Sequence, residues 1–212
     1  MTPTIVSVNV GRPKAREWHG RLVTSAIYKE PVDGPILASD VNLAGDDQAD
    51  RRVHGGFDKA VYAYASEDYE WWERQLGRPL GPATFGENIT TAGLDLTNSA
   101  IGDRWRVGEA VLEVAQPREP CFKLGMRMGD AAFRDQFEAA GRPGVYLRIL
   151  EPGLVAAGDA FTVEPAEEPA IRISDLVGDL SPEVLRRVVA DSRVPDGWRR
   201  GAAKALERVG RI

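Results

Sequence analysis

The feature that most restricts the fold of this chain is a series of short strand-like runs separated by glycine and proline. TIVSVNV (4–10) alternates β-branched apolar residues with polar ones, and RLVTSAIY (21–28) and KAVYAYA (59–65) repeat the signal. Glycine-broken runs follow in GENITTAG, AIGDRWRVG and AVLEVAQP, and late strands are expected at 144–150 and 160–164. This pattern favours a mainly β (α+β) fold: a closed or nearly closed β-barrel with helices inserted between its strands.

Two helices and one tight turn are predicted within the β region. Ser66 opens SEDYEWWERQL at a position that suits an N-cap, acidic residues follow it, and Gly77 ends the helix. A second helix is expected over 130–140, where phenylalanines stand four residues apart. Gly108-Glu109 is predicted to form a hairpin turn.

The composition changes after Phe161. Residues 164–170 are rich in proline and glutamate, as is typical of a linker, and three short helices are predicted behind them. The second helix would have Ser181 as its N-cap, and the third would run from about Asp196 to Val209. We therefore expect a β-barrel domain over 1–164 and a small three-helix domain over 165–212, the latter a packing or interaction module.

Composition excludes several classes of protein. The net charge of −5 does not favour binding to nucleic acid or to an anionic membrane, and no run approaches the roughly 18 apolar residues of a membrane span. A single cysteine excludes an intramolecular disulfide. The N-terminus has no secretory pattern, so we expect a cytoplasmic protein. The sequence contains no Walker A, G-x-G-x-x-G, CxxC or G-x-S-x-G motif, and two histidines cannot form a His-rich zinc site.

Two polar clusters at strand ends are candidates for chemistry. In RRVHGGFDKAVY (51–62), His54 precedes two glycines that would let the backbone approach a ligand closely. In FGENIT (85–90), Glu87 and Asn88 open a strand, where their side chains could bind loop amides or a ligand. Taken alone, each cluster is better explained as a structural turn.

The third cluster is QPREPCFKL (116–124), which contains the only cysteine, Cys121. A lone cysteine is often a small buried hydrophobe. However, prolines stiffen this segment, and Arg118, Lys123 and Arg127 would favour a thiolate if their side chains point inward. A thiolate is a soft ligand for a metal, so a structural and a functional cysteine both remain open at this point.

Together, HGGFDKAVYAY (54–64), FGENIT (85–90), QPREPCFKL (116–124) and RPGVYLRIL (142–150) resemble the MOSC family, in matching order and spacing. With the helical tail, the chain resembles the YiiM-like branch of that family. The resemblance implies a β-barrel with a cleft for the molybdenum cofactor, a pyranopterin dithiolene that ends in a phosphate. Lys and Arg residues suit such an anion.

The resemblance also implies a set of site residues. Cys121 matches the family cysteine that ligates molybdenum or handles sulfur, so it is assigned as the metal ligand. The catalytic candidates are Cys121, His54, Lys59 and Glu87. The cofactor-binding candidates are His54, Gly55, Gly56, Lys59, Asn88, Arg118 and Lys123.

The implied function is that of a molybdenum oxidoreductase that reduces N-hydroxylated compounds of the hydroxylaminopurine type, a detoxification. Because no flavin, haem or iron–sulfur motif is visible, electrons would come from a separate reductase. The alternative is a sulfur or cofactor carrier in which Cys121 bears a persulfide. A third reading is a binding module whose tail docks a partner. The sequence leaves a homodimer open.

Overall fold

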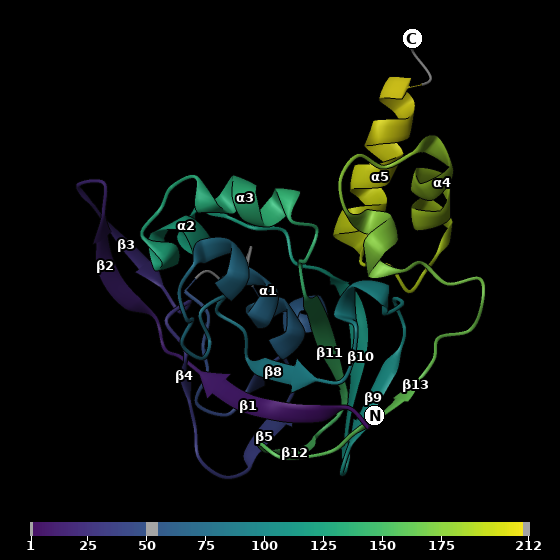
Figure 1. Ribbon diagram of the computed structural model, residues 1–212. Helices are drawn as coiled ribbons and strands as arrows, with labels where there is room; N and C mark the ends of the chain where they lie inside the picture. Colours follow the sequence, from purple (N-terminus) through teal and green to yellow (C-terminus); the bar gives the residue numbers. More distant parts are fainter. Residues whose placement is uncertain (1, 50–54, 210–212) are drawn as a thin grey trace.

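The body of the molecule is an eight-stranded mixed sheet that forms a half-barrel (Figure 1). The computed structural model describes residues 2–49 and 55–209. The strand order is β13-β9-β10-β11-β7-β8-β1-β4, in which β7 and β8 run parallel and the other neighbours antiparallel. The strands are β1 (Thr4–Val10), β4 (Glu30–Pro31), β7 (Val61–Ala65), β8 (Ile89–Ala92), β9 (Arg104–Val107), β10 (Ala110–Pro117), β11 (Val145–Glu151) and β13 (Thr162–Glu164).

Backbone hydrogen bonds tie the first strand to the segment that leads into the last one. The amide of Ile5 donates to the carbonyl of Asp159 at 2.8 Å, and the amide of Phe161 donates to the carbonyl of Pro3 at 3.0 Å. Because residue 161 leads directly into β13, these bonds bring the first strand of the chain, β1, close to the last strand, β13. The prediction of a mainly β fold with inserted helices is confirmed, but the sheet forms a half-barrel and not the closed or nearly closed barrel that was expected.

Two smaller sheets accompany the half-barrel. One joins β12 (Gly153–Val155), β5 (Ile36–Ser39) and β6 (Asn42–Leu43). The other is a hairpin of β2 (Lys14–Trp18) and β3 (Arg21–Ser25), which projects from the body as an arm (Figure 1). Strand β2 was not predicted, since KAREW lacks an apolar alternation.

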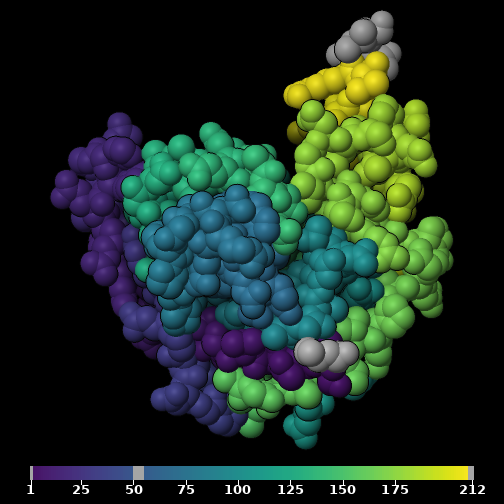
Figure 2. All heavy atoms as spheres, viewed as in Figure 1, coloured from purple at the N-terminus to yellow at the C-terminus, as the bar shows by residue number. Residues whose placement is uncertain are grey.

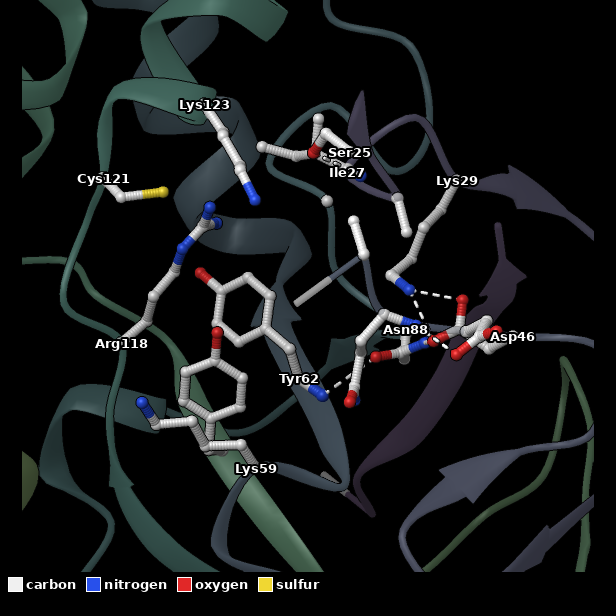
Figure 3. Close-up of a pocket in the computed structure, with 16 residues that line it drawn as sticks. Ser25, Ile27, Lys29, Asp46, Lys59, Tyr62, Asn88, Arg118, Cys121 and Lys123 are labelled. Carbon is white, nitrogen blue, oxygen red and sulfur yellow. Dashed lines mark hydrogen bonds and ion pairs between the residues drawn. The ribbon is translucent and has the colours of Figure 1, made fainter. Parts of the chain in front are cut away.

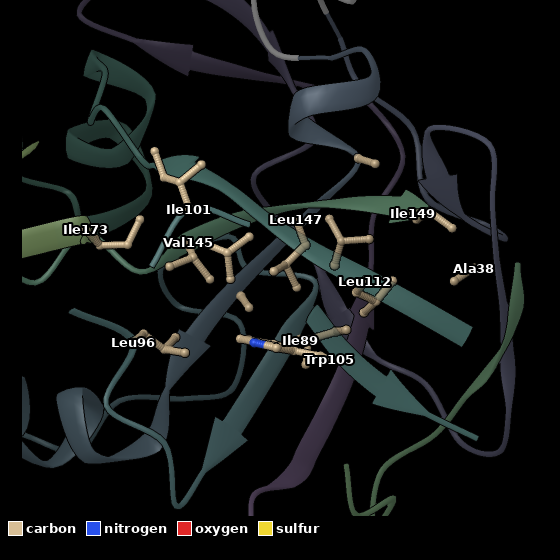
Figure 4. Close-up of a cluster of buried hydrophobic side chains, with 14 of the residues drawn as sticks. Ala38, Ile89, Leu96, Ile101, Trp105, Leu112, Val145, Leu147, Ile149 and Ile173 are labelled. Carbon is tan, nitrogen blue, oxygen red and sulfur yellow. The ribbon is translucent and has the colours of Figure 1, made fainter. Parts of the chain in front are cut away.

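The main hydrophobic core fills the inside of the half-barrel (Figure 4). In β9, Arg104 and Arg106 are exposed whereas Trp105 and Val107 are buried, which is the alternation expected of a strand with one face in the core. The ring of Trp105 stacks on Phe161 at 4.9 Å between centroids. All eight residues of β10 are buried, so this strand is covered on both faces.

Three helices cover the sheet on one side over a second, aromatic cluster. They are α1 (Ser66–Leu76), α2 (Phe122–Met128) and α3 (Phe133–Ala139) (Figure 1). Trp72 of α1 stacks on Phe137 of α3 with centroids 5.9 Å apart, and its indole N–H donates to the hydroxyl of Tyr64 at 2.8 Å. Phe85, fully buried, packs against the same rings.

The local predictions for these helices are mostly confirmed. Gly77, at φ 65°, ends α1 in the left-handed region, as predicted. The N-cap prediction was wrong by one residue: Ala65 is the cap, and Ser66 is the first helical residue, with its hydroxyl bound to Glu67. Helix α2 was not predicted, because its apolar residues stand at every second position, as in a strand, and not three or four apart.

The tail contains a 3₁₀ helix, η3 (Ile173–Leu176), and two α-helices, α4 (Pro182–Ala190) and α5 (Asp196–Val209). The hydroxyl of Ser181 accepts a hydrogen bond from the amide of Val184, which confirms the predicted N-cap of α4. Apolar residues of the tail, such as Leu185, belong to the same hydrophobic cluster as the barrel core. The domain boundary at 164/165 stays a prediction.

The proline-rich connection to the tail is held against its surroundings. The guanidinium of Arg193 donates to the carbonyls of Glu167 at 2.6 Å and Pro169 at 2.7 Å. The carbonyl of Arg193 in turn accepts from Arg148 of β11 at 2.8 Å. These bonds fasten the helical tail to the barrel. No helix in the described ranges is long and apolar enough to cross a membrane.

Candidate functional site

A polar pocket opens where the end of β10 meets the segments around residues 25–29 and 46–49 (Figure 3). One wall follows the turn from β10 into α2 and carries Cys121. The floor is formed by Tyr62 of β7 and Tyr146 of β11, whose rings lie 5.2 Å apart. These two tyrosines face each other because β7 and β11 are paired, with Tyr62 directly opposite Tyr146.

On the Cys121 wall, three side chains point into the same space. Figure 3 shows the sulfur of Cys121 with the guanidinium of Arg118 and the amine of Lys123 directed toward it. Arg118 is only 8% exposed, donates to the carbonyl of Phe85 and lies 4.8 Å from the centre of the Tyr62 ring. Burial alone would lower the pKa of Arg118, but the nearby tyrosines and Cys121 outweigh burial and raise that pKa. The guanidinium is therefore a fixed positive charge beside the thiol.

The opposite wall is a buried ion pair that the sequence analysis missed. The amine of Lys29 lies 2.5 Å from Oδ2 of Asp46, and their side chains are 8% and 1% exposed. The other oxygen of Asp46 accepts from the amide of Gly11 at 2.7 Å. Burial lowers the pKa of Lys29, and the charge of Asp46 opposes that shift. Lys29 and Asp46 are 17 positions apart in loop-rich sequence, and no local pattern marks either as a site residue.

Asn88 connects this ion pair to the strands behind it. Its amide nitrogen donates to Asp46 Oδ2 at 2.9 Å and to the carbonyl of Asn9 at 3.2 Å. Its amide oxygen accepts from the backbone N–H of Tyr62 at 3.1 Å. Both donor hydrogens of Asn88 are thus used within the protein. Asn88 positions the wall of the pocket.

The pocket is basic although the chain as a whole carries a net charge of −5. Among its described lining residues are two carboxylates and four cationic side chains, namely Lys29, Lys59, Arg118 and Lys123. The amine of Lys59 lies 6.0 Å from the ring centre of Tyr146, at the floor. A concentration of positive charge in a concave site attracts an anionic ligand.

The structure brings together five of the residues predicted for the site. Cys121, Lys59, Asn88, Arg118 and Lys123 all line the pocket. They come from segments that are up to 64 residues apart in sequence, so their proximity depends on the fold.

Three other predicted residues do not line the pocket. Gly55 and Gly56 line a neighbouring groove on the side of the C-terminal helices, and Gly56 has φ 94°. Glu87 is fully buried and does not line the pocket: Oε1 accepts hydrogen bonds from the hydroxyls of Tyr69 and Thr90. His54 lies outside the described residues.

Glu87 gives a testable pH dependence. Burial raises its pKa above the ordinary value of 4.5. A carboxyl with a higher pKa in the folded state binds more protons when folded, so the free energy of unfolding falls as pH rises through that pKa. We expect Glu87→Gln to reduce this fall, measured by denaturant unfolding at about pH 5 and about pH 8. Glu70→Gln, at an exposed carboxylate, is the control. An unchanged slope in Glu87→Gln would contradict the assignment.

Comparison with known proteins agrees with this architecture. The model of the MOSC domain matches residues 50–162. The chain belongs to the MOSC family. It is 35% identical to the uncharacterized protein YflK of Bacillus subtilis over 211 residues, 97% of this chain and 96% of that protein. It is 39% identical to Protein YiiM of Escherichia coli over 137 residues, 63% of this chain and 61% of that protein.

Similarity to a solved YiiM structure places this MOSC protein in the YiiM-like branch, and another relative has a name that states an activity. The crystal structure of YiiM from Geobacillus stearothermophilus superposes with a TM-score of 0.79 at 30% identity, covering 96% of this chain and 99% of that one. A protein of Gibberella moniliformis named "Reductase" is 35% identical over 165 residues, which is 75% of this chain but 29% of that protein. The resemblance seen in the sequence is confirmed, and MOSC domains are associated with the molybdenum cofactor.

Proposed function

We propose that this chain binds the molybdenum cofactor in the Cys121 pocket and reduces N-hydroxylated compounds of the hydroxylaminopurine type, with electrons from a separate reductase. The observation that carries the proposal is the thiol of Cys121 directed into a basic pocket of an acidic protein. Membership of the MOSC family and the similarity to a protein named "Reductase" support an oxidoreductase.

The residues of the pocket fit the chemistry of that cofactor. The cofactor is an anion that ends in a phosphate, and Arg118, Lys59 and Lys123 offer cationic donors to it. Cys121 offers a sulfur, a soft donor of the kind that transition metals accept. When bound, the cofactor would supply the redox chemistry for reduction of an N–O bond.

The side chains of the chain itself orient the ligand and supply protons. Arg118 is held by the Phe85 carbonyl and by the faces of two aromatic rings, so it presents its charge without reorganisation. Burial raises the pKa of Tyr146, so its phenol stays protonated and can donate a hydrogen bond at neutral pH. We assign proton delivery to Lys59 Nζ and Tyr146 Oη at the floor. Glu87 lies off the pocket wall, bonded to Tyr69 and Thr90, and is assigned no part in proton delivery.

Loading experiments test the proposal. We expect the purified or reconstituted protein to retain molybdenum and pterin in about equal amounts, measured by elemental analysis and pterin fluorescence. Lys123→Glu should weaken retention about tenfold, because reversing a charge near an anion changes the interaction by at least about 1 kcal/mol per unit charge. Lys204→Glu, at an exposed position on α5, is the matched control.

Two outcomes would contradict the proposal. One is equal retention of the cofactor by the wild-type protein and Lys123→Glu. The other is a loaded protein that does not reduce an N-hydroxylated purine with a chemical electron donor. A persulfide on Cys121, formed with a cysteine desulfurase and without bound metal, would favour the sulfur-carrier alternative.

A further inference from the structure

A second concavity lies between the barrel and the C-terminal helices. It has a volume of about 770 Å³, and its walls come from η1 (Phe57–Lys59) on the barrel side and from α5 on the other. Figure 2 shows the molecular surface hollowed beside it, between the lobe of α3 and the lobe that carries α4 and α5. Ligand sites for small molecules span about 300 to 1,000 Å³, so the groove is large enough for a nucleoside.

The groove adjoins the Cys121 pocket. Lys59 lines both of them. Arg118 lines the pocket and also a smaller cavity of about 240 Å³, which shares Glu119, Leu180 and Trp198 with the groove. Glu119 is also close enough to Tyr146, on the pocket floor, for its charge to raise the pKa of that phenol. A ligand lying in the groove would therefore end at the pocket.

An aromatic residue lines the groove on each of two sides. Phe57, with half of its surface exposed, stands on the barrel side, and Trp198 stands on α5. On the same helix, Gly201 has no side chain and Ala202 has only a methyl group, so neither fills the groove. Aromatic rings bind planar heterocycles by stacking, at little cost in side-chain entropy.

The charge of the groove is opposite in sign to that of the pocket. Its described lining includes Asp58, Glu119 and Asp179 but one cationic side chain, Lys59. Asp58 is already paired with Arg148 at 2.7 Å, which leaves the two exposed acids, Glu119 and Asp179, to set the local charge. These carboxylates would repel a phosphate group in the groove, whereas they would not repel an uncharged ring.

We infer that this groove is the substrate subsite, in which Trp198 and Phe57 stack on an uncharged planar N-hydroxylated heterocycle. The inference rests on the proposed reductase function and narrows it to bases and nucleosides, with nucleotides rejected. It also gives the C-terminal helices a role: α5 forms one wall of the subsite and determines specificity.

Filling the groove tests the inference. A Cβ added to Gly201 would meet no atom within 4 Å, and leucine is the better helix former, so Gly201→Leu should fold while occupying the groove. We expect KM for N-hydroxyadenosine to rise at least about tenfold, the value of one lost stacking contact. Lys204→Leu, on the same helix but outside the groove, is the matched control and should leave KM unchanged.

The charge of the groove gives a second test. We expect kcat/KM for N-hydroxyadenosine to exceed that for its 5′-monophosphate about tenfold, since the two exposed carboxylates repel the phosphate. The double variant Glu119→Gln/Asp179→Asn should reduce this ratio severalfold, mainly by raising kcat/KM for the monophosphate. An unchanged ratio in the double variant, or equal use of both substrates by the wild-type protein, would overturn the selectivity.

A binding measurement separates failure of the groove from failure of the reductase. Without cofactor, the protein should bind N-hydroxyadenosine, followed by saturation-transfer NMR, and Gly201→Leu should lose the signal that Lys204→Leu keeps. If the protein binds in this pattern but does not reduce the ligand when loaded with cofactor, the proposed reaction is wrong and the assignment of the groove as the subsite stands. If Gly201→Leu keeps full activity and unchanged binding, the groove is not the substrate subsite, and the proposed reaction stands.

Discussion

Replacing Arg148 by alanine is expected to lower the free energy of unfolding by about 3 to 5 kcal/mol. The Arg148 side chain is 10% exposed and bonds to Asp58 at 2.7 Å, to Glu113 at 2.8 Å and to the carbonyl of Arg193 at 2.8 Å. Its loss leaves Glu113 buried with the more exposed Arg104 as its remaining partner and removes one of the hydrogen bonds between the tail and the barrel. The cost is large because a buried carboxylate without its cation is not rehydrated. Chemical denaturation with a two-state fit measures the change.

Arg106→Ala is the matched control for Arg148→Ala. Arg106 lies on the neighbouring strand β9 and pairs with Glu164 at 3.1 Å, but both side chains are about half exposed. Exposed ion pairs contribute about 0 to 1 kcal/mol, so this variant should unfold almost as the wild-type protein does. Equal losses in the two variants would show that burial is not what makes the Arg148 contacts strong.

Replacing Cys121 by serine is expected to lower the turnover of an N-hydroxylated substrate at least about 100-fold in protein loaded with cofactor. Replacing a residue that only supports a metal ligand lowers metal affinity or activity about 10- to 100-fold. Replacing the ligand itself should cost more, because serine offers a harder, less acidic donor than a thiol. Molybdenum and pterin content should fall less than turnover, because Arg118, Lys59 and Lys123 still hold the anionic part of the ligand. Steady-state kinetics, normalised to bound molybdenum, measure the effect.

Phe122→Leu is the control for Cys121→Ser. Phe122 is the next residue in the chain, its side chain is half exposed, and it does not line the pocket. This variant should retain full turnover. If Cys121→Ser kept full molybdenum-dependent reduction, the sulfur would not be needed for the reaction and its assignment as a ligand would be wrong.

Local features of the sequence predicted the elements that local interactions determine. The turn at Gly108-Glu109 connects β9 and β10, and α5 runs from Asp196 to Val209 as expected. The Ser181 cap needs only the amide of Val184, three residues further on. Four motifs in the correct order predicted the MOSC family and placed Cys121 among basic residues, since their order and spacing are properties of the chain itself.

Only the tertiary structure decided which way adjacent side chains face. Glu87 and Asn88 are neighbours in FGENIT, but Asn88 supports the pocket wall while Glu87 turns away to Tyr69. Successive residues near a strand point to opposite faces, and the sequence does not say which face is the site.

The sequence by itself determined the family, the single thiol and the basic residues around it. The tertiary structure decided the rest of the site: the Lys29–Asp46 pair and the groove between α5 and the barrel. Both depend on contacts between segments that are far apart in the chain, where no local periodicity records the partner. Folding also gave the pocket a positive charge and the groove a negative one, a separation that the net charge of −5 conceals.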